Sequence, residues 1–240
     1  DADFGLDPER RYGVSALDNI ETDHDQVIVR YRYDVSEVTG ISVTAYSNDH
    51  ARDWFKTEGI DFDGSASAEA FSRTSWSSVV AGINDGSGAG GATAAELQAW
   101  LDGSADTAAG SIQLRSNSRE YFSRGVQLAL DHAFSTGNAD HQLEVGIRLH
   151  EDEEDRLQRN STYSQSAGTL VLDDLGLLGN AGNRIQEARA LALHVYDQIE
   201  IGKWTFTPGI RYEDIEQGRI RFETRLGNTD DPSRRDAANV

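Results

Sequence analysis

The sequence predicts an all-β protein built from antiparallel hairpins, and two observations carry this prediction. Apolar and polar side chains alternate along six segments, and a period of two residues is typical of β-strands. The segments come in pairs joined by short turns, whereas long polar connections separate the pairs. We therefore expect hairpins at about residues 23–55, 119–158 and 184–216, and long loops at about 57–118 and 160–183.

The first hairpin opens with residues 26–35, where Val27, Val29 and Tyr31 share one parity. Arg30 and Arg32 take the opposite parity, so they are expected on the other face of the strand. A short turn at about 36–40 leads to residues 41–50, which alternate in the same way. This segment is predicted to return antiparallel to the first.

The central hairpin has the most regular pattern. Its arms, residues 126–134 and 141–149, each place apolar side chains on one face and charged or polar ones on the other. The linking residues 135–140 include Gly137 and Asn138, which tolerate the left-handed backbone of a tight turn. The two arms should therefore pair with each other.

The third hairpin is predicted from residues 190–199 and 204–212, with a turn at about 200–203. Pro208 lies inside the second arm and has no N–H to donate to a strand ladder. We expect an irregularity there.

One short helix is predicted inside the long loop at 57–118, which is otherwise rich in Gly, Ser and Ala. Thr93 and Glu96 have the spacing of a capping box, in which each side chain bonds the backbone N–H of the other residue. The helix should run through Leu97 and Trp100 and end near Asp102.

Composition excludes several functional classes. Twenty-two basic and 41 acidic residues give a formal net charge of −19, which opposes binding to nucleic acid phosphates. The chain has no cysteine, so thiolate metal sites and cysteine nucleophiles are excluded. No apolar run approaches the ~20 residues of a membrane helix, but a membrane β-strand needs only about 9 to 11 residues with every second one apolar.

Two architectures fit the hairpins: a soluble or secreted β-sandwich that binds a partner through long loops, or a segment of a transmembrane β-barrel. In a sandwich the apolar parity faces a core, whereas in a barrel it faces lipid. All short turns are predicted at one end of the sheet and all long loops at the other, which is typical of outer-membrane barrels. The barrel is also favoured by aromatic residues near the short turns, where an interfacial girdle would lie: Tyr31, Tyr33, Phe134, Trp204 and Phe206.

The chain resembles the β-barrel of TonB-dependent outer-membrane receptors, the group that includes ferric citrate and siderophore receptors. The resemblance spans nearly the whole chain and rests on the order and spacing of several strand-like motifs more than on any one of them. These motifs are Asp7–Tyr12 leading into Asp23–Tyr31, Thr44–Trp54, Gly146–Arg156 and Phe206–Asp214.

The resemblance implies a barrel of about 22 strands in the outer membrane of a Gram-negative bacterium, closed by a plug that contacts TonB. Such a receptor takes up a ferric chelate (a siderophore or ferric citrate) or a similar nutrient and is not an enzyme. Residues 1–240 would then form a partial barrel domain of about six antiparallel, up-and-down strands with long extracellular loops. The plug would lie outside this chain, the partners would be the chelate, TonB and membrane lipid, and no cofactor is expected.

Candidate ligand-binding residues are the arginines on the polar parity: Arg30, Arg32, Arg148 and Arg211. A guanidinium group pairs with carboxylates in a fork geometry, so these arginines could contact an anionic chelate in the lumen. The alternative, which is the more common arrangement, is that they pair across strands with neighbouring carboxylates such as Glu144 and Glu213.

Other motifs give no catalytic or metal site. The six histidines lack paired metal-ligand spacing. In the segment 61–72 the sixth and twelfth positions, where an EF-hand calcium loop requires glycine and glutamate, are Ala66 and Ser72. The sequence has no nucleotide-binding glycine motif and no nucleophile elbow. The acidic run 151–155 is either the solvated end of a strand or a rim that binds divalent cations.

Overall fold

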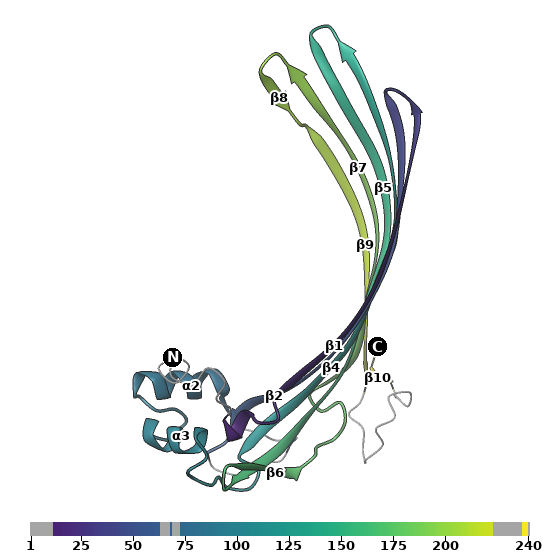
Figure 1. The fold of residues 1–240 in the computed structure, drawn as a ribbon. Coiled ribbons are helices and arrows are strands. Elements are labelled where there is room, and N and C mark those ends of the chain that lie inside the picture. The colour runs from purple at the N-terminus through teal and green to yellow at the C-terminus, as the bar shows by residue number, and fades with distance from the viewer. Residues whose placement is uncertain (1–11, 63–67, 69–72, 223–236, 240) are drawn as a thin grey trace.

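Six long antiparallel strands form one bowed sheet (Figure 1). The computed structural model describes residues 12–62, 68, 73–222 and 237–239. Each long strand pairs with the next long strand in the chain, so the predicted up-and-down order is confirmed. The long strands are β1 (Asn19–Ser36), β2 (Thr39–Ile60), β4 (Ile112–Thr136), β5 (Ala139–Ser166), β7 (Gly182–Ile201) and β9 (Gly209–Phe222).

Four short strands extend this sheet. They are β3 (Thr74–Ser75) on β2, β6 (Thr169–Asp174) on β5, β8 (Trp204–Phe206) on β7 and β10 (Ala237–Asn239) on β9. Pro208 lies in the break between β8 and β9, as its missing N–H leads one to expect. Its carbonyl still accepts a hydrogen bond from the backbone N–H of Asp197 at 3.0 Å.

The three short turns between long strands lie at one end of the sheet and the long connections at the other, where β5 also turns back into the short strand β6 (Figure 1). Gly137 and Gly202 occupy two of these turns with φ of 64° and 61°, a backbone region that glycine adopts without strain. This segregation of turns and loops agrees with the prediction from sequence.

The strands reach further into the predicted loops than the sequence indicated. β2 continues to Ile60, β4 begins at Ile112 and β5 continues to Ser166, so the expected loop bounds of 57–118 and 160–183 are too wide. At this end both parities are buried, with Gln113 2% and Leu114 0% exposed. The alternation of apolar and polar residues that marks a half-exposed strand is therefore absent.

Two helices lie in the first long connection, of which the sequence predicted one. Helix α3 (Ala94–Leu101) has the predicted capping box, with Thr93 N–H donating to Glu96 at 2.8 Å and Glu96 N–H donating to Thr93 at 3.3 Å. Helix α2 (Trp76–Asp85) is capped by Ser75, which accepts from the N–H of Ser78. Neither helix is long and apolar enough to cross a bilayer. A short 3-10 helix, η1 (Gly13–Ser15), precedes β1.

The long strands divide the sheet into an apolar face and a polar face. On the apolar face Val145 pairs with Leu130 and Val195, and Ile147 pairs with Leu128 and Leu193. Several of these side chains are exposed, including Leu128 at 45%, Val145 at 44% and Ile147 at 38%. Within the described ranges all strands belong to one sheet and no second sheet covers these residues, so the β-sandwich interpretation is wrong.

Two small apolar clusters form the buried core, and both lie at the loop end of the sheet. One contains Val14 with Ile112, Leu114 and Tyr163. The other contains Ile60 with Val79 and Leu97 of the two helices, and Trp76 packs against both clusters. The loops are therefore anchored on strands β2, β4 and β5.

The sheet does not close on itself. β1 lies at one edge, and at the other edge β10 pairs only with Arg221 and Phe222 at the end of β9. Six long strands are fewer than the eight of the smallest membrane barrels, so an open segment of barrel wall is the expected form.

Candidate functional site

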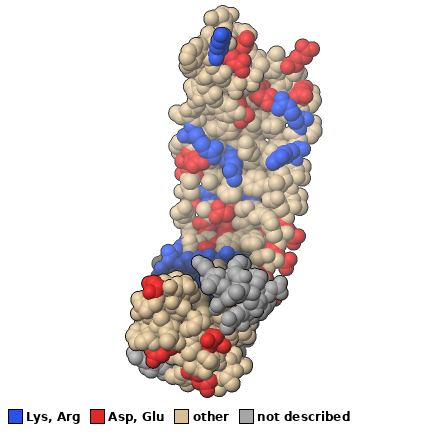
Figure 2. All heavy atoms as spheres, turned by 60° about the vertical axis from the view of Figure 1, so that its left-hand side comes forward, with Lys and Arg blue, Asp and Glu red and all other residues tan. Residues whose placement is uncertain are grey.

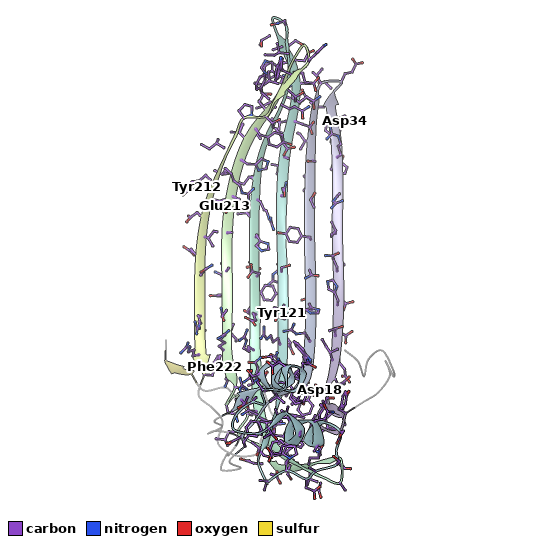
Figure 3. All side chains as sticks on the ribbon, turned by 90° about the vertical axis from the view of Figure 1, so that its left-hand side faces the viewer. Asp18, Asp34, Tyr121, Tyr212, Glu213 and Phe222 are labelled. Atoms are coloured by element: carbon purple, nitrogen blue, oxygen red, sulfur yellow. The ribbon has the colours of Figure 1, made fainter. Side chains whose placement is uncertain are left out.

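The polar face of the sheet carries charged side chains in rows that run across the strands. Figure 3 looks onto this face, which carries Tyr121, with α2 and α3 in front of the loop ends of the strands. Because paired residues lie side by side, the register assigns each side chain to a row.

The four arginines predicted from sequence all lie on this face in two adjacent rows. Arg30 and Arg148 belong to one row, and Arg32 and Arg211 belong to the next. Arg30 and Arg32 lie together on β1, whereas Arg148 is three strands away on β5 and Arg211 lies on β9, the last long strand. The four arginines share a face but are not gathered at one point.

Three of these four arginines have partners within the protein. Arg32 forms a bidentate pair with Asp131 at 2.7 and 2.9 Å and also contacts Asp34 at 2.9 Å. Arg211 donates to Glu213 at 2.6 and 2.8 Å. Both pairings follow the alternative that the sequence left open, in which lumen arginines meet neighbouring carboxylates.

Arg148 belongs to a hydrogen-bonded group with Tyr46 and His150. Its guanidinium donates to the Tyr46 hydroxyl at 2.7 and 3.1 Å and lies over the same ring. The Tyr46 hydroxyl is also 2.6 Å from Nδ1 of His150. The Tyr46 side chain lies over Gly125, so a Cβ atom added to Gly125 would be only 2.4 Å from the Tyr46 hydroxyl.

Arg30 differs from the other three. It forms no ion pair or hydrogen bond with any residue that the structure describes, and its side chain is exposed. Of the predicted set, it is the arginine whose charge is available to a ligand without breaking an existing contact.

A second row of arginines, which the sequence did not reveal, lies nearer the loops. Residues directly opposite one another on five neighbouring strands are all arginine. We call this set the arginine row: Arg52 on β2, Arg119 on β4, Arg156 on β5, Arg184 on β7 and Arg221 on β9. Figure 2 shows a band of basic side chains across the sheet next to the loop region.

The arginine row has few counter-ions. Glu154 binds Arg156 at 2.7 Å and Arg119 at 3.2 Å. In the part of the chain that the structure describes, Arg52, Arg184 and Arg221 form no ion pair, and the Nε atoms of Arg52 and Arg184 are buried without a hydrogen-bond partner.

Neighbouring residues add further positive charge to this region. Lys56, Arg115 and Arg73 converge on the single carboxylate of Glu58 at 3.1 to 3.3 Å. Arg219, one row away on β9, lies within electrostatic reach of Arg184. The arginine row and these four residues give nine basic side chains in the region of Glu58 and Glu154, although the formal net charge of the chain is −19.

The acidic run 151–155 is divided between the two faces because strand side chains alternate. Glu151, Glu153 and Asp155 share the parity of the apolar residues, whereas Asp152 and Glu154 point to the polar face. On the apolar side Glu151 binds Arg124 at 2.5 Å and lies 3.9 Å from Arg189. These three residues follow one another along β5 at the loop-side boundary of the apolar band.

The histidines are dispersed over both faces. Among the described residues no group of three or more His, Asp and Glu side chains has the geometry to hold a metal ion. His194 instead binds Glu144 at 2.9 Å, and His141 binds Asp197 at 2.7 Å. These pairings are structural.

An open, up-and-down sheet with an exposed apolar face and a charged opposite face is the wall of a transmembrane β-barrel. The family model described as TonB dependent receptor-like, beta-barrel matches residues 2–238. The chain therefore belongs to the TonB-dependent receptor β-barrel family. Of the motifs behind the predicted resemblance, Asp7–Arg11 lies outside the described residues.

Solved structures of similar fold include three receptors. The ferric citrate transporter FecA in its unliganded form is 15% identical with a TM-score of 0.56, over 92% of this chain and 24% of that one. The ferric-catecholate import receptor Fiu from E. coli K12 is also 15% identical with a TM-score of 0.56, over 92% of this chain and 29% of that one. The siderophore receptor PiuA from Acinetobacter baumannii is 15% identical with a TM-score of 0.56, over 88% of this chain and 28% of that one. The chain thus spans about a quarter of the length of these receptors.

Proposed function

We propose that this chain is part of an outer-membrane receptor that takes up a ferric chelate, such as a siderophore or ferric citrate, or a similar anionic nutrient. The observation that carries this proposal is the two-faced wall, with aliphatic side chains exposed on one side and arginines on the other. An apolar exterior suits lipid, and a cationic interior suits a ligand that carries carboxylate or phenolate charge.

The proposal extends to location and energy coupling. The segregated turns and loops fit a barrel in the outer membrane of a Gram-negative bacterium, with the short turns on the periplasmic side. Uptake would be driven through TonB by the plug domain of such a receptor. We assign no catalytic step and no cofactor.

Within this proposal Arg30, Arg32, Arg148 and Arg211 face the lumen as candidate ligand contacts. Arg30 is the strongest of them because its charge is unpaired within the described residues. Arg32, Arg148 and Arg211 would have to exchange a protein partner for the ligand, and that exchange reduces the net gain.

The test is uptake of radiolabelled ferric citrate and of a ferric tricatecholate by cells that carry the full-length receptor, with and without TonB. We expect TonB-dependent uptake of at least one of these chelates, and a severalfold reduction by Arg30→Gln. Lys203→Gln at a short turn is the control and should leave uptake unchanged. Uptake that is independent of both the receptor and TonB would refute the proposal.

A further inference from the structure

The arginine row has a defined length and a defined direction. Its five members lie directly opposite one another on adjacent strands, and strands are spaced ~4.8 Å apart. The row therefore extends for ~19 Å across the sheet, perpendicular to the strands.

One small anion cannot span such a row. A carboxylate or phosphate group engages one guanidinium in a bidentate pair, or bridges two that are close together. Arg52 and Arg221, at the two ends, are too far apart to share one group. Neutralising the row requires several oxyanion groups distributed along its length.

The protein itself supplies one carboxylate to this row. Glu154 lies beside the middle of the row and binds Arg119 and Arg156, which leaves Arg52 on one side and Arg184 and Arg221 on the other. Placing five like charges side by side costs free energy, and directly opposed like charges destabilise a sheet. An anionic ligand bound to this surface would offset the repulsion between the arginines.

We propose that the arginine row is a binding site for an extended polyanion, a molecule that carries at least three phosphate, sulfate or carboxylate groups along ~10 to 19 Å. The site is distinct from the rows of Arg30, Arg32, Arg148 and Arg211, which are mostly paired within the protein. The proposal rests on the function proposed above, because it names the class of ligand that the lumen admits. It predicts selection by length as well as by charge.

The test is equilibrium binding to the purified full-length receptor in detergent, with linear inorganic polyphosphate of about six phosphates as the extended probe and citrate as the compact one. Arg52→Gln combined with Arg184→Gln removes two cations that have no carboxylate partner. We expect polyphosphate affinity to fall at least tenfold and citrate affinity to change less than threefold. Arg189→Gln, on the same strand as Arg184 but on the apolar face, is the matched control and should change neither.

Three results would overturn the proposal: no loss in the double variant, an equal loss in Arg189→Gln, or equal losses for both probes. Heat-modifiable migration on gels verifies that each variant is folded. Arg184→Lys keeps the positive charge, so a variant with lysine at this position should retain most of the polyphosphate affinity that Arg184→Gln loses. The binding assay is independent of transport. If the purified receptor binds polyphosphate through the row but cells take up no chelate, the binding site is supported and the transport function is refuted. If cells take up a chelate but the row variants bind polyphosphate normally, the transport function is supported and the binding site is refuted.

Discussion

The imidazole of His194 lies directly over Gly146, on the neighbouring strand. A Cβ atom on Gly146 would be 2.2 Å from Cε1 of His194, so the ring occupies the space that any other residue would fill. This position allows Nε2 of His194 to reach Glu144 at 2.9 Å.

Replacing Gly146 with alanine should therefore destabilise the wall by about 1 to 3 kcal/mol, the usual cost of overpacking. The ring must move, and its contact with Glu144 is lost. Denaturant unfolding of the refolded full-length receptor measures the change. His194→Ala should relieve the clash, so the double variant should lose less stability than the two single losses added together; strict additivity would contradict this account.

The two faces of β5 and β4 should tolerate charge differently. Val145→Arg places a cation within the apolar run, which costs about 2 to 4 kcal/mol near the middle of a bilayer. Gln127→Glu places a charge on the polar face directly opposite Arg148, where it is favourable. The fraction of receptor assembled in the outer membrane should fall for the first variant only. Equal tolerance of both changes would mean that the apolar face does not contact lipid.

The cap of α3 predicts a pH dependence in the loop region. The backbone N–H and the hydroxyl of Thr93 hold the pKa of Glu96 below its ordinary value of 4.5. Because the pKa is lowered in the folded state, this contribution is present in full above pH 4.5 and disappears as the pH falls through the lowered value. Hydrogen exchange of α3 should accelerate on acidification below pH 4.5, and Glu96→Gln should reduce this dependence.

Removing the cap itself should act at neutral pH. Thr93→Ala loses the acceptor of the Glu96 N–H and should cost about 1 kcal/mol of local helix stability. Thr93→Ser keeps the hydroxyl and serves as the control. Exchange rates of the first turn of α3 that are identical in both variants would contradict the role of the cap.

Gln165 joins the end of β5 to the first long connection. Its side chain is fully buried and donates to the carbonyls of Trp100 at 2.8 Å and Ala105 at 3.0 Å. Gln165→Leu leaves the Ala105 carbonyl without a donor, which costs about 1 to 3 kcal/mol for a buried group, whereas the Trp100 carbonyl still accepts from the N–H of Gly103 at 3.3 Å. Protease cleavage within residues 94–110 should become faster, whereas Thr169→Ala at an exposed position of β6 should leave the rate unchanged.

The hairpins were predictable because apolar and polar residues alternate along strands that have one apolar and one polar face. Residues 126–134 and 141–149 alternate strictly, and Gly137 marks the turn between them. The same rule fails where loops cover both parities, as at Gln113 and Leu114. Helix α2 was missed because its Ser- and Gly-containing sequence resembles a loop, although Ser75 supplied a recognisable N-cap.

The arginine row could not be predicted because it depends on register between strands. Arg52, Arg119 and Arg156 are far apart in the chain, and a shift of one residue in any pairing would move an arginine to the other face. The four arginines that the sequence did indicate were found from parity alone. Parity gives the face of the sheet, but not the partner across it.

The position of the arginine row along the strands would make capture of the proposed anionic ligand depend on the salinity of the medium. Arg156 lies five residues beyond Glu151, the residue that ends the apolar band, which is ~17 Å along the strand. In the proposed outer-membrane orientation, the row would therefore lie outside the hydrocarbon layer and be exposed to external ions. Its attraction extends over a Debye length of about 8 Å at 0.15 M salt but only about 3 Å at 1 M. A receptor of this design would draw in anions from a distance in fresh water and only on contact in brine.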